Sequence, residues 1–201
     1  SEALKGPHWR YNALLQKAYW DAIGRDDILF QGSSGSHWSW HLLSRNASAD
    51  GHGEEHAIEV QLPFLQTILD DFKILPLVIG DQSKEICFKL GEVLGKALKG
   101  KNALIVASTD LSHYHPYDMA KKMDKIAIDD VAKFDYEKLF TDLDGRETEA
   151  CGGGPAAAAM IAAKILGANK AEILHAVNSG DMTGEKGGVV GYMSAALYKS
   201  A

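Results

Sequence analysis

The stretch that most constrains the fold is Ala103–Tyr117, where an apolar run gives way to closely spaced polar side chains. The run itself, Ala103–Ala107, is apolar and partly β-branched, which is typical of a buried strand in a parallel sheet. Ligands of such sheets bind at the carboxyl ends of the strands. The polar residues that follow are Ser108, Thr109, Asp110, Ser112, His113, Tyr114 and His115. We therefore expect a functional site here; the alternative is that Asp110 caps a turn and the histidines lie on the surface.

The composition predicts one globular domain spanning residues 1–201, because 201 residues with 46% hydrophobic content can bury a single core. The net charge of −6, with dispersed lysines and arginines, argues against a nucleic-acid or membrane partner. The longest apolar stretch, Pro155–Ala163, is too short to span a bilayer. With two cysteines and no charged-then-apolar leader, we expect a cytoplasmic protein.

Hydrophobic periodicity predicts alternating helices and strands, the pattern of an α/β protein. The predicted helices cover residues 11–23, 56–65 with a kink at Pro63, 83–99, 117–134, 136–142 and 156–166. The predicted strands cover residues 28–30, 72–80, 103–107, 171–177 and 189–197, and residues 38–55 are expected to form a loop. The strand over 189–197 has enough small and apolar residues to be buried on both faces.

Three histidines of the N-terminal part each lie beside a predicted element. His8 precedes the first helix, His37 ends a glycine- and serine-rich loop, and His56 opens a helix next to Glu54, Glu55 and Glu59. Each could bind a metal or carry a proton. The alternative is that the histidines are structural or exposed and that the acidic residues complement the helix dipole.

Cys151 precedes three glycines and Pro155, so it lies where a loop meets a helix. A cysteine near a helix N-terminus has its thiolate favoured by the dipole, which makes it a nucleophile or a soft metal ligand. The alternative is that the glycines bind an anion or turn the chain and that Cys151 is a small buried residue.

Four motifs in order resemble the Memo family, also called AmmeMemoRadiSam system protein B. They are EEHAIEVQLPFL at 54–65, STDLSHY at 108–114, ACGGGPAAA at 150–158 and SGDMTG with VVGY at 179–192. The Memo family is similar in turn to the LigB-like class III extradiol dioxygenases, which use non-haem Fe(II). The resemblance implies an α/β fold with three αβα layers and a mostly parallel central sheet. It implies the fold and not the reaction.

The resemblance also implies a metal site. Memo proteins hold a metal with two histidines and a cysteine, and the matching residues here are His8, His37 and Cys151. Such a ligand set is compatible with Fe(II), Cu or Zn. The sequence departs from the family pattern at Trp9–Arg10, beside the first histidine, and in a shorter segment between the second histidine and His56.

The same resemblance implies a set of catalytic residues. His113 matches the general base of the dioxygenases, and His56 matches a further active-site histidine. With His113 as proton acceptor, His56 or Asp110 would orient the substrate. We expect a metal-dependent oxidoreductase that acts on a small-molecule substrate. The main alternative is a non-catalytic Memo-type scaffold that binds a metal, a small molecule or a peptide, and zinc hydrolysis has the least support. The family name suggests radical-SAM and AMMECR-type proteins as partners.

Overall fold

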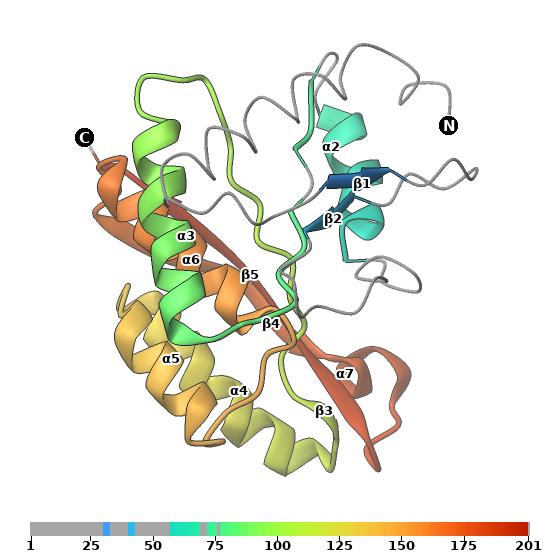
Figure 1. Cartoon of the computed structure of the whole chain (residues 1–201). Coiled ribbons are helices and arrows are strands. Elements are labelled where there is room, and N and C mark those ends of the chain that lie inside the picture. Colours follow the sequence, from blue (N-terminus) through green and yellow to red (C-terminus); the bar gives the residue numbers. More distant parts are fainter. Residues whose placement is uncertain (1–29, 33–39, 43–56, 69–71, 76, 201) are drawn as a thin grey trace. The chain divides into compact units, whose positions relative to one another are not determined.

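The computed structural model describes residues 30–32, 40–42, 57–68, 72–75 and 77–200. The chain divides into two compact units, Ser1–Asp81 and Gln82–Ala201 (Figure 1). The predicted helix over 11–23 lies outside the described residues, as do His8, His37 and His56.

The first unit contains a two-stranded ribbon and a short helix. Strand β1 (Phe30–Gly32) pairs antiparallel with β2 (Trp40–Leu42), and a 3₁₀ turn, η1 (Glu59–Gln61), leads into α2 (Leu62–Ile68). Pro63 is the second residue of α2. The predicted kink is therefore wrong, because a proline in the first turn replaces an N–H that would have no helical partner.

Two strand predictions in the N-terminal part also differ from the structure. Strand β2 lies in the segment 38–55, which is predicted to be a loop. Its three residues form a strand because they pair with β1. The described residues of the predicted strand over 72–80 form no strand. An apolar run becomes a strand only where a neighbouring strand can bond its backbone groups.

The second unit has a three-stranded antiparallel sheet with the order β3-β5-β4. The strands are β3 (His113–His115), β4 (Lys170–Asn178) and β5 (Val189–Tyr198). The helices are α3 (Lys84–Ala97), α4 (Tyr117–Ala132), α5 (Tyr136–Asp144), α6 (Gly153–Ile165) and α7 (Ser179–Thr183). Helices α3 to α6 and strands β4 and β5 match the predictions within a few residues, because each carries its own hydrophobic period.

The helices build one core against one face of the sheet. Helix α4 packs against β4 and β5, and α6 packs against both α3 and α5 (Figure 1). The buried centre consists of Leu111, Ala127, Val131, Leu139 and Met160, and Ile173, Met193 and Leu197 of the sheet pack against it. Cys87 of α3 is fully buried.

The run Ala103–Ala107 is not a strand in this structure. Leu104 is 74% exposed and Val106 is 47% exposed, so the expected burial is wrong as well.

In β5, Val189 and Gly191 are buried but the later residues are not, so the strand is not covered on both faces. Among the described residues the fold is mixed helix and strand with a small antiparallel sheet, and no parallel pairing occurs there. The described part of the chain also contains no helix that is both long and apolar enough to cross a bilayer.

Two buried carboxylates meet where α4 packs on α5. Asp130 of α4 is 4% exposed, and its Oδ2 has no hydrogen-bond partner. Asp142 of α5 is 6% exposed and accepts hydrogen bonds from the ammonium of Lys138. Burial, followed by the influence of the neighbouring Asp142 carboxylate, raises the pKa of Asp130 to about 6.

This raised pKa predicts that folding stability falls as the pH rises from about 4 to about 6. Folded Asp130 keeps a proton that the unfolded chain, with a pKa of 3.8, releases. Asp130→Asn should remove this contribution, which amounts to up to about 3 kcal/mol. The free energy of unfolding in urea, measured at about pH 4 and about pH 7, checks the expectation. Asp129→Asn, an accessible carboxylate on the same helix, should keep the wild-type difference between the two pH values. An identical pH dependence in Asp130→Asn and the wild type would contradict this assignment.

Candidate functional site

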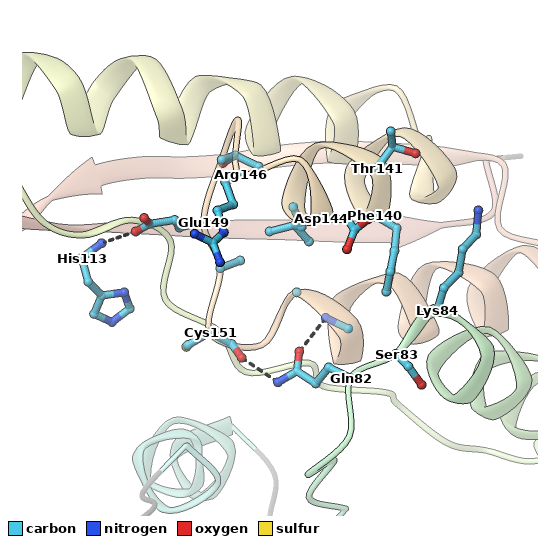
Figure 2. Close-up of a pocket in the computed structure, with 15 residues that line it drawn as sticks. Gln82, Ser83, Lys84, His113, Phe140, Thr141, Asp144, Arg146, Glu149 and Cys151 are labelled. Carbon is cyan, nitrogen blue, oxygen red and sulfur yellow. Dashed lines mark hydrogen bonds between the residues drawn. The ribbon is translucent and has the colours of Figure 1, made fainter.

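A pocket of about 840 Å³ opens in the second unit beside the start of α6 (Figure 2). Its wall includes His113 from β3, the chain between α5 and α6, and Gln82 at the start of the unit. Cys151 lies on this wall with its side chain exposed. The pocket therefore contains an imidazole and a thiol that lie far apart in the sequence.

Hydrogen bonds fix the glycine-rich start of α6. The Gly152 amide donates to Thr109 Oγ1 at 2.8 Å, and the Gly154 amide donates to Gln82 Oε1 at 2.9 Å. Gln82 Nε2 in turn donates to the Cys151 carbonyl at 2.8 Å. A Cβ at position 152 would lie 2.3 Å from the Ser108 carbonyl oxygen, so this contact requires glycine. The helix thus begins three residues earlier than predicted, because its first turn is built on bonds from distant segments.

The Cys151 sulfur receives a direct backbone hydrogen bond from the STDLSHY motif. The Asp110 amide lies 3.2 Å from Sγ, and Thr109 Oγ1 lies 3.8 Å from it. The Cys151 amide donates back to the Asp110 carbonyl at 3.2 Å. The Asp110 N–H is thus directed at a sulfur that lies on the pocket wall, and cysteine sulfur is a nucleophile or a soft metal ligand.

His113 lies between two carboxylates. Its Nε2 is 3.7 Å from Asp110 Oδ2, and its backbone amide donates to Glu149 Oε2 at 3.3 Å. The other Glu149 oxygen is 3.0 Å from Nε2 of His115. Burial acts to raise the pKa of Glu149, but the hydrogen bonds from His115 and His113, with the charges of both rings, lower it below its ordinary value. Glu149 therefore stays ionised and joins the two histidines.

The backbone between the two histidines is irregular. Tyr114 has a φ of 60°, an uncommon conformation for a residue with a side chain. His113 pairs with Val190 and His115 with Val189, so the register shifts at this point. Glu149 bonds on both sides of the shift, and it therefore holds the bulge that sets the position of His113.

A buried carboxylate anchors the residues just before His113. Asp124 of α4 is 6% exposed, and its Oδ1 accepts the Ser112 amide at 2.9 Å. A Cβ on Gly191 would lie 2.1 Å from Asp124 Oδ2, so only glycine admits the carboxylate there. Gly191 also accepts from the Leu111 amide at 2.8 Å and donates to the Ser112 carbonyl at 2.9 Å. Helix α4 and strand β5 thus hold this loop from two sides.

Comparison with known proteins identifies the family to which the chain belongs. The family model described as Memo-like protein matches residues 41–196. The chain belongs to the Memo family. A MEMO1 family protein of Methanosarcina mazei is 43% identical over 145 residues, covering 71% of this chain and 54% of that protein. One from Nitrosopumilus maritimus is 42% identical over 142 residues, covering 70% and 52%. One from Saccharolobus solfataricus is 43% identical over 148 residues, covering 72% and 52%. The chain spans about half the length of the curated relatives it matches.

The structure brings three of the predicted Memo site residues together. Asp110 contacts both the Cys151 sulfur through its amide and the His113 ring through its carboxylate. The other three, His8, His37 and His56, lie outside the described residues. Among the described residues, no three His, Cys, Asp or Glu side chains form a group that could hold a metal ion. The metal and catalytic roles therefore remain predictions.

Three residues of this Memo pocket carried no role in the sequence analysis. Glu149 stands two positions before Cys151, which was the one available signal for it. Gln82 bonds Cys151 across 69 positions, and nothing in its own segment indicates this contact. Arg146 also lines the pocket, and the sequence gives no reason to single it out among the basic residues.

Asp124→Ala tests the anchor of the Memo motif. The change leaves the buried Ser112 amide without its acceptor, so we expect a loss of about 1–3 kcal/mol in the free energy of unfolding. Amide exchange at Leu111 and Ser112 should accelerate at the same time, as measured by hydrogen exchange. Asp129→Ala, which removes an accessible carboxylate of the same helix, should have a much smaller effect on the free energy of unfolding and leave that exchange unchanged. Equal effects of the two substitutions would show that Asp124 is no anchor.

Proposed function

We propose that this Memo protein is a metal-dependent oxidoreductase that acts on a small-molecule substrate. The observation that carries the proposal is that Asp110 links the Cys151 thiol and the His113 imidazole at one pocket. A soft ligand and a proton acceptor that share a pocket are the two groups that metal-assisted oxidation needs from the protein.

The proposed metal ligands are Cys151, His8 and His37. Cys151 suits the role because its side chain is exposed and its sulfur is held in place by a hydrogen bond from the Asp110 amide. Two imidazoles and a thiolate form a borderline-to-soft set, which fits Fe(II) or Cu, with Zn as a further candidate. A redox metal held there would supply the electron transfer of an oxidation.

The proposed work of the other residues is proton transfer and positioning. His113 accepts a proton from the substrate at Nε2, and the Asp110 carboxylate, 3.7 Å away, stabilises the cationic ring that results. Glu149 keeps the ring in place through the backbone amide of the same histidine. His56 is proposed to orient the substrate.

The wider parts of the proposal rest on the family resemblance and, for the location, on the composition of the chain. We propose that the α/β fold is a three-layer αβα arrangement with a mostly parallel central sheet, and that the protein works in the cytoplasm. Radical-SAM and AMMECR-type proteins are the proposed partners. The alternative is a non-catalytic Memo-type scaffold that binds a metal, a small molecule or a peptide without turnover.

Metal analysis tests the proposal. We expect the wild type, reconstituted anaerobically with Fe(II), Cu(I) or Zn(II), to hold about one equivalent of its preferred metal by mass spectrometry. Cys151→Ser should lose that metal because it removes the thiolate ligand. Cys87→Ala is the matched control, since this cysteine is fully buried and should leave the metal content unchanged. A wild type without metal, or a Cys151→Ser variant that keeps it, would contradict the proposal and favour the scaffold.

His113→Gln separates catalysis from binding. It should keep the metal content of the wild type and reduce kcat by about 10²–10⁴ on any substrate found by dioxygen-consumption screening. A rate equal to that of the wild type would remove His113 from the role of general base.

A further inference from the structure

Arg146 places a guanidinium in the pocket from the chain between α5 and α6. Its φ of 59° is uncommon for a residue with a side chain, and two backbone bonds hold this turn. The Arg146 amide donates to the Leu143 carbonyl at 3.1 Å, and the Glu147 amide donates to the Asp142 carbonyl at 2.9 Å. Figure 2 shows the side chain reaching from this turn into the pocket, on the side where Glu149 and Cys151 lie. The backbone therefore directs the guanidinium into the pocket and not along α5.

No carboxylate among the described residues forms an ion pair with this guanidinium. Glu149 lines the same pocket, but its two oxygens accept from the His113 amide and the His115 ring. Asp144 also lies on the wall and makes no ion pair with Arg146. A guanidinium carries five N–H donors in a plane that matches a carboxylate or a phosphate. These donors are available to a ligand of the pocket.

The start of α6, which also borders the pocket, cannot supply the same donors. The amides of Gly152, Gly153 and Gly154 donate to Thr109, Ala150 and Gln82. Pro155 has no amide hydrogen. The second cation on the wall, Lys84, lies 5.0 Å from the centre of the Phe88 ring. Arg146 is therefore the best-placed donor for a negative group that enters the pocket.

We propose that Arg146 binds an oxyanion of the substrate, a carboxylate or a phosphate, whose reacting end lies beside Cys151 and His113. This inference rests on the proposed function, because it takes the ligand of the pocket to be a substrate. It names the substrate class as small organic acids or phosphate esters. Arginine suits this role better than lysine because its planar fork can bond both oxygens of such a group.

Alkylation of Cys151 tests the proposal without any turnover. The full chain, freed of metal by a chelator, is treated with iodoacetate or iodoacetamide, which differ in charge, and modification is followed by peptide mass spectrometry. Cys87 is fully buried, so Cys151 is the thiol that reacts. In Arg146→Gln the ratio of the iodoacetate rate to the iodoacetamide rate should fall about three- to tenfold. The wild-type ratio should fall in the same direction at about 1 M salt, which screens the charge.

Lys84→Gln is the matched control, because it removes the other cation of the same wall. It should change the rate ratio less than twofold. An unchanged ratio in Arg146→Gln, or an equal fall in Lys84→Gln, would overturn the proposal.

Three probes of similar shape then distinguish the two oxyanions. Benzoate, phenyl phosphate and the neutral benzamide are tested for slowing the reaction of Cys151 with iodoacetamide. Slowing by benzoate or phenyl phosphate that disappears in Arg146→Gln supports the proposal and identifies carboxylate or phosphate as the preferred group. Slowing by benzamide to the same extent, or by none of the three, overturns it. Arg146→Gln should keep the metal content of the wild type, so a failed metal measurement and a failed alkylation measurement remain separate results.

Discussion

The site depends first on the hydrogen bond from the Ser112 amide to the buried carboxylate of Asp124. That carboxylate lies against the backbone of β5, where Gly191 leaves room for it. The bond fixes the loop between the core residue Leu111, which is 1% exposed, and the partly exposed His113. A buried carboxylate is costly unless it is bonded, so this bond favours the packing of helix, strand and loop that the structure shows. The position of the His113 ring therefore depends on this core contact as well as on the Glu149 hydrogen bonds at the pocket.

A second set of contacts connects the anchored loop to the Cys151 thiol. Asp110 lies just before the anchored loop, and its amide and carbonyl bond to Cys151 Sγ and the Cys151 amide. Gly152 makes the approach feasible, because any side chain there would collide with the Ser108 carbonyl. The two motifs are thus joined through backbone groups. This kind of contact tolerates change in the surrounding side chains but not in the small residues that allow it.

The sequence predicted the helices of the second unit well because each has an amphipathic period that needs no partner to be recognised. It failed for Ala103–Ala107, since a β-branched run indicates a strand only when another strand pairs with it, and pairing is not a local property. The residues of the candidate site likewise divide into those with a local sequence signal and those without one. Asp110, His113 and Cys151 could be predicted because they lie in dense polar or glycine-rich motifs. Gln82 and Glu149 could not, because their roles arise from contacts across 69 positions and across the β3 bulge.

Glu149 connects the two properties that the pocket requires. By bonding the His113 amide and the His115 ring, it uses both oxygens to hold the bulge at Tyr114. The carboxylate is turned toward the two histidines, and it forms no ion pair with Arg146 on the same wall. The proposed proton acceptor and the proposed anion-binding group therefore share Glu149 as a neighbour on the pocket wall, and Glu149 bonds to the residues of the first and not to the second.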